Sequence, residues 1–353
     1  MNPGIDRTLV ILARGGLGDL LCGTPVFEAL KSRFPETEIT AMVRESAAPL
    51  LKGNPVIRDV IKTNDKDLDT IPGFRKSLSE IRKKNFNRAI ILWSKAPEAW
   101  LVRLAGIPVR VGQDSRLAYS FNYTHRVRVR SEHGDTESHW ADILLDYARA
   151  LGIKAKAERL FLYVDDNEKQ KARDFLKNLG LPPDEPYMIF HSGKGIPITP
   201  KNWPVKHFSK LARSLHEMTS LPVLLTGTIG ELEAVSAIAE SAGDNMYNIC
   251  GKTDIRLLCG LVSSSSLLLC PDSGPMHIAA ALKIPTIALF GLKSDFPNRW
   301  RPLGTRHRIL VPDDYRCKKH CIKEKCKYFV CYEGITPESV GNAAMSLLSE
   351  EKA

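Results

Sequence analysis

Short runs of Val, Ile and Leu alternate with amphipathic helical patterns along this chain, and the alternation restarts in its second half. Runs that are apolar throughout are typical of parallel strands covered by helices on both faces of a sheet. The predicted strands span 8–13, 38–43, 56–61, 88–93 and 109–112, and then 187–193, 222–227, 246–250, 266–274 and 285–291. Two consecutive sets of this kind predict two Rossmann-like α/β domains.

The segment between the two sets predicts where one domain ends and the next begins. An acid-rich helical stretch follows residue 164, and the turn-forming LPPDEP comes after it. We therefore expect a first domain over 1–166, a second over 167–335, and a C-terminal helix over 336–353 that can pack back on the first domain. Thr336 is the predicted N-cap of that helix, with Pro337 at its first position.

The composition excludes a membrane-spanning chain and a secreted, disulfide-rich one. The longest apolar stretch, 257–269, is interrupted by Cys, Gly and Ser, so no segment reaches the ~20 apolar residues that cross a bilayer. The first apolar burst is too short for a signal peptide. Four scattered cysteines fit reduced, buried thiols: Cys22, Cys250, Cys259 and Cys270. We expect a cytoplasmic protein.

Positive charge is concentrated in the first part of the chain. Residues 1–130 hold 22 Lys and Arg against 13 Asp and Glu, a net charge of +9, whereas the remainder holds 28 against 27, a net charge of +1. This asymmetry indicates an anionic partner: a nucleic acid, an anionic membrane surface or a phosphorylated substrate. A solvated basic surface without a partner explains the charge equally well.

The first predicted strand runs into the turn Arg14-Gly15-Gly16-Leu17-Gly18-Asp19. Glycines at a strand-to-helix turn let a ligand approach the backbone. The G-x-G-x-x-G spacing of a dinucleotide site is absent, because Leu21 stands where the third glycine would be. Asp19 is predicted at the carboxyl end of the strand, where open α/β sheets bind their ligands. The alternative is that Asp19 only caps the following helix.

Three turns at strand ends in the second half fit a nucleotide diphosphate. Asp272-Ser273-Gly274 opens an Ala-rich helix whose N–H groups favour an anion; the alternative is a well-capped helix with His277 packed in its first turn. His191-Ser192-Gly193 leads into a Gly- and Pro-rich loop that contains Lys201 and Trp203. The turn over 225–233 carries carboxylates that can accept from ribose hydroxyls.

In this order and at this spacing, the motifs resemble those of the glycosyltransferases of family 9, the ADP-heptose:lipopolysaccharide heptosyltransferases. The resemblance covers nearly the whole chain, and within the family it is greatest to the heptosyltransferase II branch. It is carried by Gly18-Asp19 with Pro25, Ala105-Gly106-Ile107-Pro108, Lys201-x-Trp203-Pro204, Asp272-Ser273-Gly274-x-x-His277, and Phe290-Gly291 with Trp300 and Pro302. It implies the GT-B fold, in which an acceptor-binding and a donor-binding Rossmann-like domain face each other across a cleft.

The resemblance also implies a role for each matching residue. Asp19 is the expected catalytic base, and Lys201 is the expected catalytic contact to the donor diphosphate. The other expected donor-binding residues are Gly18, Ser192, Gly193, Glu233, Asp272, Ser273, Gly274 and His277, with Glu231 competing with Glu233 for the ribose. The expected acceptor-binding residues are Arg44, Lys62, Arg103 and Arg116.

The implied reaction is an inverting transfer of heptose from ADP-L-glycero-D-manno-heptose to the lipid A-linked inner-core oligosaccharide. No catalytic metal is expected, because Lys201 and the helix N-terminus after Asp272 can stabilise the departing ADP. Asp65 and Asp67 match a D-x-D pattern but lie in a crowded polar loop. The basic first half is expected to contact acidic sugars and the anionic inner face of the inner membrane, with the protein peripheral there, and not nucleic acid.

Two alternative functions stay open. The chain could be a family 9 transferase that uses another nucleotide sugar or a protein or polysaccharide acceptor. It could also be a non-catalytic nucleotide- or RNA-binding protein on the same fold.

A cluster of cysteines near the C-terminus adds a separate possibility. Cys317, Cys321, Cys326 and Cys331 stand in a Lys-rich segment and are compatible with a structural zinc site, with disulfides or with free thiols. Their spacing lacks the usual C-x2-C knuckle of zinc sites.

Overall fold

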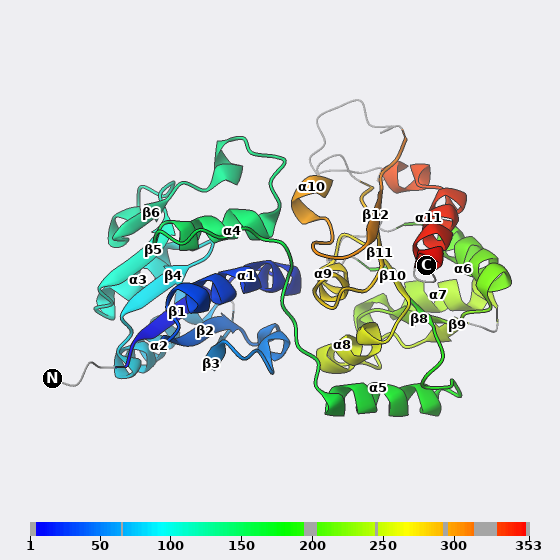
Figure 1. Ribbon diagram of the computed structural model, residues 1–353, viewed down its shortest axis with the longest axis horizontal. Helices are drawn as coiled ribbons and strands as arrows, with labels where there is room; N and C mark the ends of the chain where they lie inside the picture. Colours follow the sequence, from blue (N-terminus) through cyan, green and yellow to red (C-terminus); the bar gives the residue numbers. More distant parts are fainter. Residues whose placement is uncertain are drawn as a thin grey trace. The chain divides into compact units, whose positions relative to one another are not determined.

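The computed structural model describes residues 5–64, 66–193, 203–243, 246–291, 296–313 and 330–350. Internal contacts divide the chain into two compact units, Met1–Tyr163 and Val164–Ala353. Each unit is built around one parallel sheet with helices packed on it (Figure 1). The prediction of two consecutive α/β folds is confirmed.

The first unit contains a parallel sheet in the order β3-β2-β1-β4-β5-β6. Its strands are β1 (Arg7–Leu12), β2 (Glu38–Arg44), β3 (Ile57–Thr63), β4 (Arg88–Ile91), β5 (Val109–Gln113) and β6 (His125–Val127). Its longer helices are α1 (Leu17–Arg33), α2 (Ile71–Lys84), α3 (Ala96–Leu104) and α4 (Trp140–Arg149), and its short helical turns are η1 (Ala48–Leu51), η2 (Asp67–Asp69), η3 (Ser120–Asn122) and η4 (Arg130–His133). The chain builds outward from β1 to one side and then returns to start β4 on the other side.

The second unit repeats this arrangement, with β7 in the place of β1 and the order β12-β11-β10-β7-β8-β9. Its strands are β7 (Met188–His191), β8 (Val223–Thr226), β9 (Met246–Asn248), β10 (Leu267–Pro271), β11 (Thr286–Leu289) and β12 (His307–Leu310). Its helices are α5 (Asp166–Asn178), α6 (Val205–Thr219), α7 (Leu232–Ala242), α8 (Ile255–Ser263), α9 (Gly274–Ala281), α10 (Pro297–Trp300) and α11 (Pro337–Ser349), with the short turns η5 (Ile229–Glu231) and η8 (Val330–Gly334).

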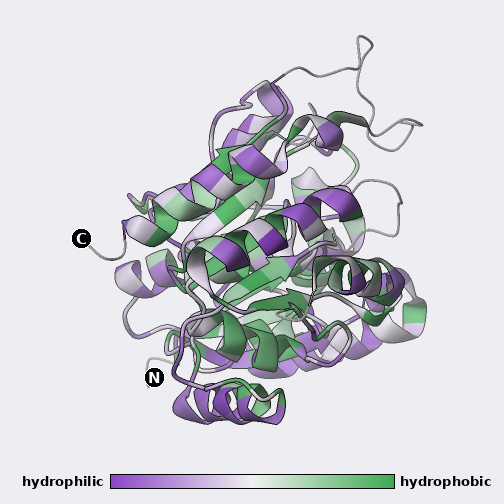
Figure 2. Ribbon diagram, turned by 90° about the vertical axis from the view of Figure 1, so that its right-hand side faces the viewer, coloured by the Kyte–Doolittle hydropathy of each residue, from purple (hydrophilic) through white to green (hydrophobic). Residues whose placement is uncertain are grey.

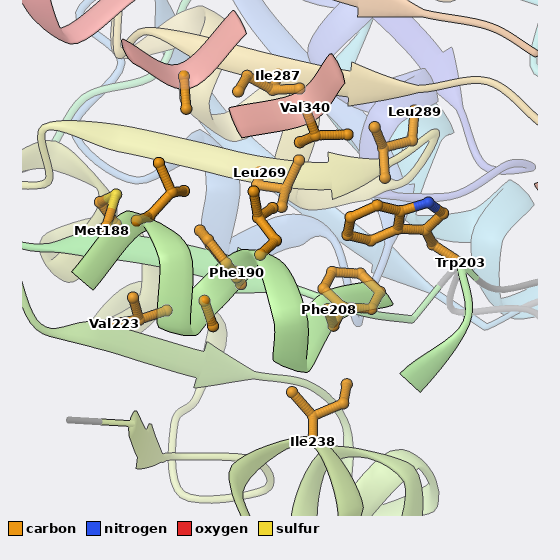
Figure 3. Packing of buried hydrophobic residues seen from close by; sticks show 14 of the residues in the cluster. Met188, Phe190, Trp203, Phe208, Val223, Ile238, Leu269, Ile287, Leu289 and Val340 are labelled. Atoms are coloured by element: carbon orange, nitrogen blue, oxygen red, sulfur yellow. The ribbon is translucent and has the colours of Figure 1, made fainter. Parts of the chain in front are cut away.

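The buried face of the second sheet shows how the apolar runs become a core. The strand residues Phe190 and Leu269 are fully enclosed between the sheet and its helices (Figure 3). Phe208 of α6 and Val340 of α11 pack against them from the helix side. The helix α11 therefore packs against α6 and over the strands of this unit. Its N-cap is Thr336, as predicted, because the Thr336 side chain accepts from the N–H of Ser339.

Polar side chains cover the outer faces of these helices. Figure 2 shows hydrophilic residues along the helices, whereas the strands at the centre of the sheet are hydrophobic. Within the described ranges, no helix is both long enough and apolar enough to cross a membrane.

Two edge strands were not predicted from the sequence. Both β6 (His125–Val127) and β12 (His307–Leu310) are short, carry His and Arg, and lie at one end of their sheets. An edge strand has a neighbour on one side only, so it needs no continuous apolar run. The remaining strands match the predicted runs, although β10 ends at Pro271 because the next residues turn into α9.

We predict that Trp203→Phe destabilises the second unit by about 1–3 kcal/mol. Trp203 is fully buried, its indole N–H donates to the carbonyl of Ile335 over 2.8 Å, and its ring packs edge-on against Phe208. Phenylalanine removes the hydrogen bond and part of the buried volume. Urea unfolding followed by circular dichroism measures the change, and Trp100→Phe, at a side chain that is 38% exposed, is the control that should cost less than about 0.5 kcal/mol. Equal losses in both variants would contradict this role for Trp203.

Candidate active site

The first sheet has a crevice where β1 and β4 lie side by side. After β1 the chain continues into α1, and after β4 it continues into α3, so the two connections leave neighbouring strands in different directions. Open α/β sheets bind ligands at the carboxyl ends of such a strand pair. A pocket of about 160 Å³ opens there. It is lined by Gly15 and Asp19 after β1, by Trp93 and Lys95 after β4, and by Trp140 at the start of α4, among others.

Asp19 stands in the first turn of α1, with its carboxylate in this pocket. Gly16 occupies the N-cap position, so the predicted alternative of Asp19 as the N-cap residue is wrong. The carboxylate does serve the helix end, because it accepts from the N–H of Gly16 over 2.8 Å. Gly15 has a φ of +104°, and a Cβ there would lie 2.7 Å from the Asp19 carboxylate, so glycine is needed for this close approach.

Burial raises the pKa of the Asp19 carboxyl above its usual range. Hydrogen bonds from the Gly16 N–H and the Trp140 side chain oppose this shift, as does the positive charge of Arg44. The carboxylate is therefore held by donors that favour its charged form, in a setting that makes it a stronger base than an exposed aspartate.

Two arginines fix the turn that carries Asp19. The Arg14 guanidinium donates to both oxygens of Asp69 and, over 2.6 Å, to the buried carboxylate of Glu98. The hydrogen bond to Asp69 is the largest cause that raises the pKa of Arg14, and the contact with Glu98 adds to it. The two carboxylates therefore balance the charge of Arg14. Arg44, at the end of β2, donates to the carbonyl of Gly15 over 2.8 Å.

The other three predicted acceptor contacts lie elsewhere in the first unit. Lys62 is exposed on the edge strand β3. Arg103 is exposed in the last turn of α3. Arg116 is engaged with the carboxylate of Glu132. Of the four predicted acceptor residues, Arg44 is the one that contacts the turn carrying Asp19.

Three pocket residues were missed by the sequence reasoning: Trp93, Lys95 and Trp140. Trp93 and Trp140 stand edge to face, with ring centroids 5.2 Å apart. Trp93 and Lys95 could have been proposed from the sequence, because they come directly after the strand that neighbours the first one. Trp140 gave no signal, because a Trp in an amphipathic helix normally belongs to the core.

Trp93 holds an unfavourable backbone conformation. Its φ is +55°, which costs a residue with a side chain roughly 1–2 kcal/mol. The Trp93 N–H donates to the hydroxyl of buried Tyr147 over 3.3 Å, which helps to hold this conformation, yet Trp93 stays 39% exposed. Strained residues of this kind are concentrated at ligand sites.

The second sheet has the equivalent crevice between β7 and β10. His191 ends β7 and Ser192 follows it, and both are buried. Among the described residues, neither the Oγ of Ser192 nor the Nδ1 of His191 has a hydrogen-bond partner. Burial lowers the pKa of His191, and the nearby Glu231 carboxylate opposes that shift. Buried polar atoms without partners indicate a place where a ligand or water completes the hydrogen bonding.

Glu231, and not Glu233, lies against the predicted phosphate residues. Its carboxylate accepts from the N–H and the hydroxyl of Thr228, over 2.7 and 2.9 Å. A Cβ on Gly193 would lie 1.3 Å from the Glu231 carboxylate, so any larger residue there would displace the Glu231 side chain. Glu233 is exposed in the first turn of α7.

The turn after β10 completes this crevice. Ser273 is the N-cap residue of α9, and its hydroxyl donates back to the carbonyl of Pro271 over 3.0 Å. Gly274 is the first helical residue, so the N–H groups of the first turn begin there. Asp272 is half-buried, and buried His277 packs edge-on against Trp300.

Several predicted residues lie outside the described residues: Lys201, Asp65, Cys317, Cys321 and Cys326. Cys331 is described and is buried. Asp67, the other member of the D-x-D pattern, accepts from the N–H of Asn64 over 2.8 Å. In the part of the chain that the structure describes, no group of three or more His, Cys, Asp or Glu side chains is placed to hold a metal ion.

The family model described as Glycosyltransferase family 9 (heptosyltransferase) matches residues 74–329. The chain belongs to glycosyltransferase family 9. It is therefore a glycosyltransferase, as the resemblance implied.

Individual relatives agree with this assignment. This family 9 chain is 25% identical to Lipopolysaccharide heptosyltransferase 2 of Salmonella typhimurium over 353 residues, which cover 97% of this chain and 99% of the relative. Among solved structures, it resembles the glycosyl transferase family 9 protein of Veillonella parvula, with a TM-score of 0.86, 24% identity and 99% of both chains covered. It also resembles the E. coli ADP-heptose lps heptosyltransferase II, with a TM-score of 0.79, 24% identity, and 98% and 100% covered. These structures confirm the GT-B fold class.

We predict that Asp19→Asn is more stable than the wild type at pH 7. Because burial raises the pKa of Asp19 in the folded chain above its value in the unfolded chain, the wild type loses stability as the pH rises through the folded-state pKa. The advantage of Asn should shrink as the pH falls through that pKa and disappear below the unfolded-state value. Urea unfolding from pH 3 to 8 measures it, and Asp166→Asn in the exposed first turn of α5 controls for the loss of one negative charge. A lower stability of Asp19→Asn at pH 7 would contradict the burial cost.

Proposed function

We propose that this chain is an inverting, metal-independent heptosyltransferase that moves heptose from ADP-L-glycero-D-manno-heptose to the inner core of lipopolysaccharide. The observation that carries the proposal is Asp19, a carboxylate of raised pKa in a pocket at the crevice of the first sheet. The similarity to Lipopolysaccharide heptosyltransferase 2 supports the choice of sugar and acceptor.

Asp19 acts as the general base in this proposal. The acceptor hydroxyl oxygen attacks the anomeric carbon of the heptose, and its proton passes to the Asp19 carboxylate. The bond between that carbon and the diphosphate oxygen breaks on the opposite side, and ADP leaves with the electron pair. Attack opposite the leaving group inverts the anomeric configuration. A base held in place by Gly16 and Trp140 is ready before the acceptor arrives.

The second unit binds the donor. Ser192 and Gly193 after β7, and Asp272, Ser273 and Gly274 at the start of α9, line the place of the diphosphate. The buried Ser192 hydroxyl without a partner supports this assignment, because a phosphate oxygen would satisfy it. Glu231, which lies against Gly193, is better placed than Glu233 for the ribose hydroxyls.

The departing ADP gains negative charge, which Lys201 and the N–H groups at the start of α9 neutralise in this proposal. His277 supports the first turn of that helix through its packing on Trp300. A divalent ion is then not needed for the charge.

The acceptor binds to the first unit, whose net charge favours a phosphorylated oligosaccharide at an anionic membrane surface. We place the enzyme in the cytoplasm, peripheral on the inner face of the inner membrane. Arg44 is the predicted acceptor residue that contacts the turn of the base, and its charge acts on the pKa of Asp19.

We predict that Asp19→Asn lowers kcat by about 10² to 10⁴ while the affinity for the donor stays near that of the wild type. Asparagine keeps the shape of the turn and an oxygen for the Gly16 N–H, but it cannot take the acceptor's proton. Steady-state kinetics measure this, with ADP and UDP release followed for a panel of nucleotide sugars and a deacylated inner-core acceptor, and with the product's anomeric configuration read by NMR. An almost fully active Asp19→Asn variant would show that this carboxylate serves only the helix end. UDP release, or a product of retained configuration, would overturn the donor or the inverting mechanism.

We predict that EDTA leaves the initial rate of transfer unchanged, because the chain's own cationic groups stabilise the leaving ADP. Loss of activity that magnesium restores would instead assign a metal to the D-x-D loop.

Elemental analysis of the purified chain tests the separate hypothesis of a structural zinc site. Bound zinc whose slow removal unfolds the protein would support a structural site at Cys317, Cys321, Cys326 and Cys331.

A further inference from the structure

The pocket that holds Asp19 also has an aromatic wall, to which the proposed mechanism assigns no role. Trp93 and Trp140 form this wall, edge to face, from the carboxyl end of β4 and the first turn of α4. Trp140 is buried and hydrogen-bonds the Asp19 carboxylate through its side chain. Trp93 is different, because its ring is exposed to the pocket.

Trp93 is poorly explained as a packing residue. A residue that serves the core is buried, whereas 39% of Trp93 is exposed although it has a buried tryptophan beside it. Its backbone adopts a left-handed conformation, which the hydroxyl of Tyr147 helps to hold. The fold thus maintains a large flat ring at the mouth of the pocket at the expense of backbone strain. A flat apolar ring beside a hydrogen-bonding carboxylate is the combination that binds the face of a sugar ring while holding one of its hydroxyls.

The two cationic side chains that line the pocket beside this wall differ in their ion pairs. The guanidinium of Arg14 is ion-paired with both Asp69 and Glu98. Lys95 also lines the pocket, is exposed, and forms no ion pair with any described residue. Its positive charge acts on the carboxylate of Asp69, which Arg14 already binds, so the exposed ammonium group can still meet an anion at the pocket. An anionic substituent on the bound sugar would match it.

We propose that Trp93, Trp140 and Lys95 form the subsite for the acceptor sugar that receives the transferred group. The ring of this sugar lies on the indole of Trp93, and its attacking hydroxyl reaches the Asp19 carboxylate. A carboxylate or phosphate on the same sugar, or on its neighbour, binds Lys95. Trp140 is a positioning residue, since it holds Asp19 through its indole while its ring supports Trp93. The subsite rests on the proposed function, because it assigns the acceptor side of that reaction.

The test separates acceptor binding from donor binding in the full-length enzyme. Trp93→Ala should raise the acceptor KM and the calorimetric Kd for deacylated inner-core oligosaccharide about tenfold or more, as is common when a stacking ring is removed. The donor KM should stay within about twofold, and Trp93→Phe should recover part of the loss. Trp100→Ala is the matched control, because Trp100 is equally exposed, at 38%, but lies on α3 outside the lining of the pocket. Thermal melts confirm that each variant is folded.

Lys95→Gln tests the charged part of the subsite, with exposed Lys154→Gln of the same unit as its control. Lys95→Gln should weaken binding of the anionic acceptor about three- to tenfold. Two modified acceptors then identify the partner group: if dephosphorylation abolishes the effect of Lys95→Gln the group is a phosphate, and if carboxyl reduction abolishes it the group is a sugar carboxylate. An effect that persists with both modified acceptors would show that Lys95 does not bind an anion there.

Trp140→Phe tests the positioning role. It keeps a ring beside Trp93 but removes a donor that favours the charged form of Asp19, so the acidic limb of the kcat/KM profile should move to higher pH. A lower rate with an unmoved profile would assign Trp140 a packing role only.

The outcomes also distinguish the subsite from the proposed function. If Trp93→Ala and Lys95→Gln bind the acceptor like their controls while the wild type transfers heptose, the subsite is overturned and the function stands. If the wild type binds the inner-core oligosaccharide in a Trp93-dependent way but transfers a sugar other than heptose, the donor assignment is overturned and the subsite stands. If the wild type does not bind the inner-core oligosaccharide, the subsite is overturned together with the proposed acceptor.

Discussion

Both units of this enzyme depend on one constraint of open parallel sheets. In each sheet the first strand, β1 or β7, lies next to the fourth, β4 or β10, and the remaining strands extend outward from this pair. The connections that leave the two central strands diverge, so their carboxyl ends border an open crevice that helices do not fill. Asp19 lies in the first crevice, and Ser192 and Gly274 border the second. The positions of the candidate base and of the candidate diphosphate residues therefore follow from the same strand order.

Within the first crevice, one carboxylate serves two purposes that usually conflict. Asp19 completes the first turn of α1 by accepting from Gly16, which is a structural role. Burial at the same time raises its pKa, which costs stability at neutral pH and makes it a better base. The glycine turn, the indole of Trp140 and the charge of Arg44 partly offset this cost, because each favours the charged form of the carboxylate.

Local patterns were sufficient to predict most of the fold. The continuous apolar runs gave the central strands, because a strand buried on both faces must be apolar throughout. The same reasoning missed β6 and β12, which are edge strands with polar residues. It placed Asp19, Ser192 and Gly274 at strand ends correctly, since the end of a strand is a local feature. It favoured Glu233 over Glu231 for the ribose, and that choice stays a prediction. The contact of Glu231 with Gly193 was not predictable, because it depends on how two separate turns meet.

The sequence by itself determined the two α/β repeats, the glycine turn that precedes Asp19 and the N-terminal excess of positive charge. Each of these follows from composition or from residues adjacent in the chain. Only the tertiary structure decided that Arg14 is neutralised by Asp69 and Glu98, and that Trp93, Lys95 and Trp140 join Asp19 around one pocket. The physical reason is that the sheet places β1 beside β4 and that α4 packs against α1. These contacts bring Trp93 and Trp140, 74 and 121 positions further along the chain, to Asp19. No periodicity along the sequence records that pairing.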